Sequence, residues 1–112
     1  PSYLIIKKGE HGALLFDKER RVFFAPALPL EEVFDPTGAG DTFAGGFIGY
    51  LAKTNDISFD NMKRAVIVGS AMASFCVEKF GTEMLQDLTK DQIDSRIDEF
   101  VRLAHFQMES VI

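Results

Sequence analysis

The start of the chain alternates short apolar runs with polar turns. Apolar, β-branched and aromatic side chains dominate residues 3–7, 13–16 and 21–25, and we expect a strand at each. A glycine-containing turn at residues 9–12 ends the first run, and the polar residues 17–20 predict a hairpin loop. Since the first run is apolar without alternation, its strand is expected to be covered on both faces.

Further along, apolar residues recur with a helical period. A helix opened by Gly40 or Asp41 is predicted to run to about residue 53, and a second helix, capped by Ser58, is predicted from residue 59 to about residue 79. Two prolines make residues 26–30 a surface connector, and residues 31–34 are expected to form a short strand before the first helix.

The last part of the chain predicts a third helix. Thr89 and Gln92 have the spacing of a capping box. The residues that follow give a stripe expected to face the core, made of Ile93, Ile97, Phe100, Val101 and Ala104. Strands followed by helices predict an α/β fold, with a sheet on which three helices pack.

Size and charge narrow the class of protein. The chain has 112 residues, one Cys and a formal net charge of −5, so we expect one domain at most, with neither nucleic acid nor an anionic membrane as its main partner. No apolar run is long enough to span a bilayer. A cytoplasmic protein is therefore expected, in which Cys76 is most simply a buried, inert thiol.

The chain also reads as a piece of a larger domain. It starts at Pro1 without an initiator Met and enters a strand almost at once. A strand that is apolar on both faces needs neighbours, and we expect further chain to supply some of them.

The most informative stretch for chemistry is residues 35–46, with the sequence DPTGAGDTFAGG. The small residues Gly38, Ala39 and Gly40 allow an anion to approach the backbone, and amides at a helix N-terminus favour phosphate-like charge. Asp41 follows directly, where a carboxylate would repel an anion unless it handles a proton beside it. An anion cradle beside a general base suggests phosphoryl transfer to a hydroxyl.

Three other interpretations of residues 35–46 are possible. Asp41 could be an ordinary helix N-cap, since Asp is among the best capping residues. A dinucleotide-binding fingerprint would need Gly where Phe43 stands, and a P-loop would need Lys and then Ser or Thr where Gly46 and Phe47 stand. The two glycine motifs therefore fail on spacing, whereas the cap remains open.

Residues 35–43 resemble the second signature of the ribokinase-like carbohydrate kinases, the PfkB family, whose pattern is approximately D-T-x-G-A-G-D-x-F, with Pro36 at a tolerant position. The sequence Lys8-Gly9-Glu10-His11-Gly12 is similar to the G-x-x-G turn of that family. The resemblance covers essentially the whole chain but only about the last third of a family member. It implies that residues 1–112 are the ATP-binding, C-terminal part of a three-layer αβα sandwich.

The resemblance also implies roles for single residues. Asp41 matches the catalytic base, and the amides of Gly38, Ala39 and Gly40 match the anion hole. Lys8, Gly9 and Gly12 match the turn along the nucleotide phosphates. Many relatives have Thr and an apolar residue where this chain has Lys7 and Lys8, and either lysine could reach a phosphate or belong to a solvated surface pair.

Two further sites are implied by the resemblance. The adenine edge of the nucleotide is expected near Ser70 and Ala73, although the small-residue stripe of Ala65, Gly69 and Ala73 is more simply explained by close packing. A loop for a monovalent cation such as K⁺ maps onto Asp35, Thr37, Cys76, Lys79 and Gly81.

The resemblance finally implies an activity. We expect an ATP- and Mg²⁺-dependent phosphotransferase acting on a sugar hydroxyl, and a homodimer is a compatible assembly. The alternatives are a nucleoside kinase of the same family and a non-catalytic nucleotide-binding relative. The N-x-x-E motif that helps relatives to hold Mg²⁺ does not occur in this sequence, so the chain is expected to contain the ATP side of a kinase site without the acceptor pocket.

Overall fold

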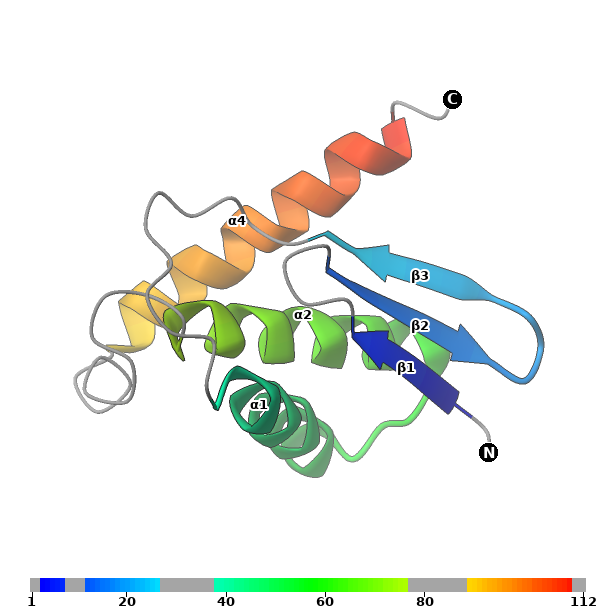
Figure 1. The fold of residues 1–112 in the computed structure, drawn as a ribbon, viewed down its shortest axis with the longest axis horizontal. Helices are drawn as coiled ribbons and strands as arrows, with labels where there is room; N and C mark the ends of the chain where they lie inside the picture. The colour runs from blue at the N-terminus through cyan, green and yellow to red at the C-terminus, as the bar shows by residue number, and fades with distance from the viewer. Residues whose placement is uncertain (1–2, 8–11, 27–37, 77–88, 110–112) are drawn as a thin grey trace.

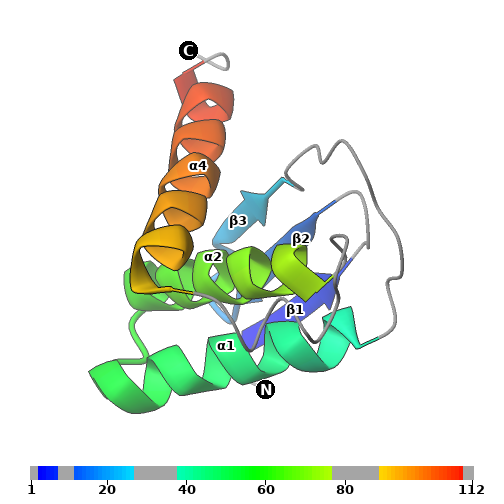
Figure 2. The same ribbon diagram turned by 90° about the vertical axis from the view of Figure 1, so that its left-hand side faces the viewer.

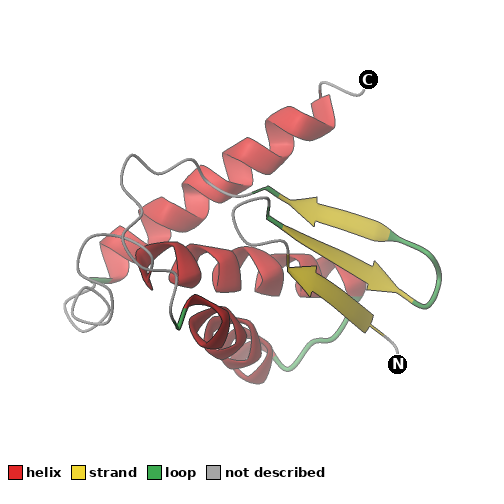
Figure 3. Cartoon of the chain, viewed as in Figure 1, coloured by secondary structure: helices red, strands yellow, loops and turns green. Residues whose placement is uncertain are grey.

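The computed structural model describes residues 3–7, 12–26, 38–76 and 89–109, which form a small sheet and three helices (Figure 1). The strands come first along the chain and the helices follow, as the sequence predicts (Figure 3). The elements are β1 (Tyr3–Lys7), β2 (Ala13–Asp17), β3 (Val22–Ala25), α1 (Ala39–Thr54), α2 (Phe59–Cys76) and α4 (Lys90–Glu109). The strand expected at residues 31–34 and the end of the second helix expected at residue 79 lie outside the described residues.

The sheet is antiparallel with the order β1-β2-β3. Leu15 in the middle of β2 pairs with Ile5 of β1 on one side and with Phe23 of β3 on the other. β2 extends one residue beyond the predicted boundary, because Asp17 still pairs with Tyr3.

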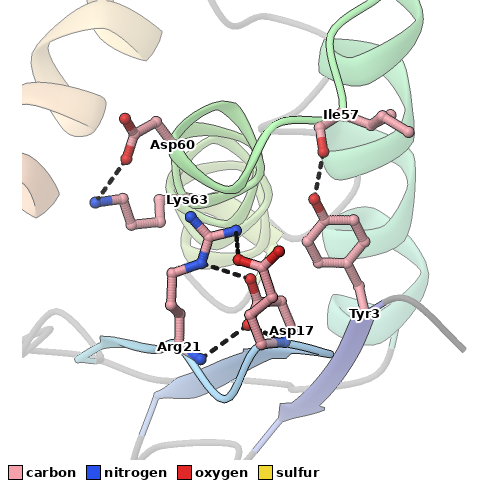
Figure 4. A network of polar contacts seen from close by, with 7 residues as sticks. Tyr3, Asp17, Arg21, Ile57, Asp60 and Lys63 are labelled. Carbon is pink, nitrogen blue, oxygen red and sulfur yellow. Dashed lines mark hydrogen bonds and ion pairs between the residues drawn. The ribbon is translucent and has the colours of Figure 1, made fainter.

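Asp17 also fixes the turn between β2 and β3. Its Oδ1 accepts hydrogen bonds from the amides of Glu19, at 3.1 Å, and Arg21, at 2.8 Å, and its Oδ2 lies 2.6 Å from Nε of Arg21 (Figure 4). Burial of this carboxylate favours its neutral form, but the hydrogen bonds and charge of Arg21 outweigh burial and hold the pKa of Asp17 below its ordinary value. The turn that composition predicts is therefore held by amide hydrogen bonds to the Asp17 carboxylate and by its ion pair with Arg21.

The helices lie on one side of the sheet (Figure 2). α2 packs on β2 and β3, α1 packs beside α2, and α4 contacts α2 and β3. Leu15 of the sheet and Val66 of α2 are fully buried, and Phe100 brings α4 into the same core. The predicted core stripe of the last helix is therefore confirmed at Phe100. It is wrong at Val101, which is 49% exposed, because the residue after Phe100 is turned about 100° away around the helix.

The opposite face of the sheet corrects the expectation for the first strand. Leu4 and Ile6 of β1 are 53% and 41% exposed, and they share this face with exposed Val22 and Phe24 of β3. Within the described residues, the helices cover only the face that carries Leu15. β1 is also an edge strand in this part of the chain, so its apolar residues are not enclosed on both sides here.

The connection between α1 and α2 is closed by polar contacts. Ser58 Oγ accepts a hydrogen bond from the amide of Asn61, at 3.3 Å, which confirms Ser58 as the cap of α2. The buried Asn61 side chain donates to Thr54 Oγ1, at 2.8 Å, and to the carbonyl of Asp56, at 2.7 Å. The hydroxyl of Tyr3 donates to the carbonyl of Ile57 and ties β1 to this connection (Figure 4).

The capping box of the last helix is also confirmed. The amide of Thr89 donates to Oε1 of Gln92 at 2.9 Å, and the amide of Gln92 donates to Oγ1 of Thr89 at 3.2 Å.

Candidate active site

The N-terminus of α1 is built on a glycine. Gly38 has φ 84° and ψ −9°, a left-handed conformation that side chains rarely adopt, and it is the N-cap of the helix. Its carbonyl accepts from the amide of Thr42, at 2.9 Å, and from the Thr42 hydroxyl, at 3.0 Å. Sequence reasoning missed Thr42, and its only signal is the four-residue spacing from Gly38. The helix thus begins directly after Gly38.

This N-terminus leaves backbone donors free. The N-cap is a glycine and no side chain caps the helix. Within the described part of the chain, the amides of Ala39, Gly40 and Asp41 have no hydrogen-bond acceptor. Free amides at the positive end of a helix dipole suit an anion such as a phosphate group.

Asp41 is the third residue of α1 and is exposed. Gly38 holds the N-cap position, so the interpretation of Asp41 as an ordinary N-cap is wrong. A carboxylate in the first turn still gains from the helix dipole, by about 0.3–1 kcal/mol. The carboxylate gains this stability without using the free amides beside it. Asp41 can therefore stabilise the helix and also act chemically at this position.

Lys7 brings a positive charge to the same place. It is the last residue of β1, and a Cβ atom added to Gly40 would lie 2.8 Å from its Nζ. The same ammonium group lies 5.4 Å from the centre of the Phe43 ring. The end of β1 and the start of α1 therefore bring together free amides, a carboxylate and an ammonium group.

α1 is held by close contact with α2. A Cβ atom added to Gly69 would lie 2.8 Å from the Phe43 carbonyl oxygen, and one added to Gly46 would lie 3.2 Å from the Cα of Gly69. Ala65 is also fully buried. The packing explanation of the small-residue stripe is therefore supported. The contact at Phe43, two residues after Asp41, holds this part of α1 against α2.

Other residues singled out in the sequence lie in different parts of the fold. Gly12, with φ 97°, precedes β2 in a conformation that favours glycine. Ser70 and Ala73 are half-buried on α2, and Ala73 packs against the core. Cys76 is the last residue of α2. The remaining predicted ligands lie outside the described residues: Lys8, Gly9, Asp35, Thr37, Lys79 and Gly81.

The site fits a phosphate better than a metal ion. Gly40 puts no side chain over the free amides, and Lys7 adds a cation beside them. Of the residues that the structure describes, no three His, Cys, Asp or Glu side chains gather to hold a metal ion.

Among the described helices, none is both long and apolar enough to cross a membrane.

Comparison with known proteins identifies the family of this chain. The model of the pfkB family carbohydrate kinases matches residues 1–90. The nucleoside kinase of Methanocaldococcus jannaschii is 34% identical over 80 residues, which are 71% of this chain and 24% of that protein. The cytidine kinase of Thermococcus kodakarensis is 54% identical over 47 residues, 40% of this chain and 16% of that protein.

Solved structures of kinases resemble this chain in fold. The crystal structure of the M. jannaschii nucleoside kinase superposes with a TM-score of 0.67 at 30% identity, over 88% of this chain and 30% of that chain. Aminoimidazole riboside kinase from Salmonella enterica, complexed with aminoimidazole riboside and an ATP analogue, gives a TM-score of 0.71 at 32% identity, over 86% and 31% of the two chains. This chain thus spans 24% to 31% of the length of these two relatives. It belongs to the pfkB family of carbohydrate kinases and has part of the ribokinase fold.

Proposed function

We propose that the protein containing this chain transfers the γ-phosphoryl group of ATP to a hydroxyl of a small molecule, and that the N-terminus of α1 is the reacting end of its site. The observation that carries this proposal is the combination of free amides at Ala39 and Gly40 with Asp41 in the same helical turn. Membership of a kinase family and the similarity to a riboside kinase solved with an ATP analogue support it.

Asp41 acts on the acceptor in this proposal. Its carboxylate takes the proton as the acceptor O–H bond breaks, and the acceptor oxygen forms a bond to the γ-phosphorus of ATP. The bond from that phosphorus to the bridging oxygen breaks, and its electron pair leaves with ADP. A positioned base of this kind contributes about 10²–10⁴-fold, and holding the hydroxyl in line with the phosphorus adds to it.

The backbone amides act on the phosphoryl group. The N–H groups of Ala39 and Gly40 point out of the helix start, where they can donate to the oxygens of the transferring group. Removing one preorganised donor from an anion hole typically costs about 10²–10³-fold in kcat. Mg²⁺, when bound, would neutralise phosphate charge, but the described residues provide no ligand cluster for it.

Three finer assignments are part of the same proposal. The adenine ring lies near Ser70 and Ala73 on α2, the turn at Gly9 and Gly12 follows the phosphates, and the backbone around Cys76 contributes to a monovalent-cation site. They are supported by the family resemblance and by the half-buried positions of Ser70 and Ala73.

For the acceptor, we propose a nucleoside or another riboside. The sequence motifs favour a sugar and leave a nucleoside as the alternative, but the relatives described above are named as nucleoside, cytidine and riboside kinases. Identity of 30% and 32% over most of this chain makes these more informative than similarity of fold alone.

The test is acceptor-dependent ADP release by the full-length protein, with the phosphorylated product identified by mass spectrometry. The panel contains cytidine, adenosine, inosine, ribose and fructose. We expect a kcat/KM for one nucleoside at least about tenfold above either sugar, a discrimination that hydrogen bonds to the base can supply. Preference for a sugar would overturn the acceptor assignment, and the absence of acceptor-dependent ADP release across the panel would contradict the proposed activity.

A further inference from the structure

Lys7 occupies an electrostatically unusual position. Its Nζ lies so near the start of α1 that a Cβ atom on Gly40 would be only 2.8 Å away. Cations are favoured at the C-terminus of a helix and disfavoured at the N-terminus, where the dipole is already positive. Two positive features therefore converge at this exposed position, and a bound anion would interact favourably with both.

Within the described residues, no anion of the protein fills this role. Lys7 forms no ion pair or hydrogen bond there, and its one specific contact is with the Phe43 ring, 5.4 Å from Nζ to the ring centre. Asp41 is in the same helical turn but is not paired with Lys7. The Phe43 contact holds the ammonium group beside Gly40 without neutralising its charge.

We infer that Lys7 binds the terminal phosphate of ATP and stabilises charge on the group being transferred. This inference rests on the proposed function and adds a residue to it. A phosphate oxygen can accept from an ammonium group and from backbone amides together, and such charge-assisted hydrogen bonds are among the strongest in proteins. Lysine supplies a compact point charge for this purpose.

The position of Asp41 identifies the phosphate concerned. A base that takes the acceptor proton must lie beside the phosphorus under attack. Because Gly40 is next to Asp41 in the sequence and Lys7 lies against Gly40, the ammonium group serves the γ-phosphate rather than the two phosphates that ATP shares with ADP. Lys7 therefore distinguishes ATP from ADP.

A purely structural role makes a different prediction. If Lys7 only packs on Phe43, its replacement affects ATP and ADP binding equally or leaves both unchanged. Lys63, which belongs to α2, is the matched control. Its Nζ also lies over aromatic rings, 5.8 Å from the centre of Phe23 and 5.6 Å from that of Phe59. Lys63→Met removes the same kind of contact away from the start of α1, together with an ion pair to the exposed Asp60 at 3.2 Å.

The experiment compares wild type, Lys7→Met, Lys7→Arg and Lys63→Met in the full-length protein, after thermal melting shows that each is folded. Calorimetry measures the affinity for ADP and for a non-hydrolysable ATP analogue, and steady-state kinetics give kcat and KM for ATP. Lys7→Met keeps the apolar stem and should weaken binding of the ATP analogue about tenfold or more, as expected for a hydrogen bond to a charged group, while ADP binding stays within about twofold.

Further results separate the outcomes. Lys7→Met should lower kcat/KM for ATP by at least about tenfold, Lys7→Arg should recover part of that loss, and Lys63→Met should match wild type. Equal losses for ATP and ADP, or wild-type values in Lys7→Met, would overturn the inference while leaving the proposed activity intact. If wild type transfers no phosphate but Lys7→Met still loses affinity for the ATP analogue alone, the proposed function fails and the phosphate contact stands.

Discussion

Gly40→Ala adds one methyl group at the start of α1, where we propose an anion hole. Gly40 is the second residue of α1 and is not among the described glycines with positive φ, so alanine can adopt its backbone conformation. Among the described residues, the added Cβ meets only the Nζ of Lys7, at 2.8 Å. That atom ends a flexible side chain, so the methyl group can be accommodated by moving the ammonium group away.

Stability and activity should therefore respond in opposite directions. Alanine is favoured over glycine within a helix by about 0.5–1 kcal/mol, an upper value for a residue in the first turn. The free energy of unfolding should stay constant or rise. The methyl group would also displace the Lys7 ammonium group and crowd the place proposed for the phosphate. We therefore expect kcat to fall by about 10²-fold, the lower end of the range for one lost anion-hole donor.

The assay pairs thermal melting with steady-state kinetics in the full-length protein. Gly49→Ala is the control, because Gly49 lies in the same helix and nothing is within 4 Å of its added Cβ. It should gain similar stability without losing turnover. A double-mutant cycle of Gly40→Ala with Lys7→Met should be non-additive, since the methyl group acts partly by moving Lys7. Wild-type kcat in Gly40→Ala would refute the assignment of these amides as an anion hole.

Two other predictions concern the scaffold. Gly69→Ala should destabilise the protein by about 1–3 kcal/mol through overpacking, because its Cβ would lie 2.8 Å from the Phe43 carbonyl oxygen; chemical denaturation would measure this, and unchanged stability would mean that α1 and α2 are free to separate. Asp17→Asn should lower the melting temperature at neutral pH, because the pKa of Asp17 is held below 3.8 in the folded state and its charge stabilises the fold above the unfolded pKa. That difference should shrink as the pH falls through and below 3.8, and a gap that is constant with pH would argue against the Asp17–Arg21 pair as its source.

Local sequence signals predicted most of the elements because each depends on nearby residues. Ser58, Thr89 and Gln92 make the capping hydrogen bonds that their spacing indicates. The observed end of β2 differs from the predicted end by one residue, because Asp17 still pairs with Tyr3 of β1. α1 also begins earlier than the predicted Gly40 or Asp41, because Gly38 holds the N-cap position.

Features set by distant parts of the chain could not be predicted in this way. The pattern of the first run gave no sign that Leu4 and Ile6 would lie on an exposed face, since that depends on which side the helices pack. The same is true of Val101 on α4. The contact between Lys7 and Gly40 joins residues from a strand and a helix far apart in sequence, and only the fold brings them together.

The most direct test of the central claim is Asp41→Asn in the full-length protein. Asparagine keeps the shape of the side chain and leaves Gly38 as the N-cap, so α1 should form normally. We predict a loss in kcat of at least about 100-fold, the lower range for a general base, with ATP affinity by calorimetry nearly unchanged. Wild-type turnover in Asp41→Asn would mean that this carboxylate only complements the helix dipole and would contradict the account.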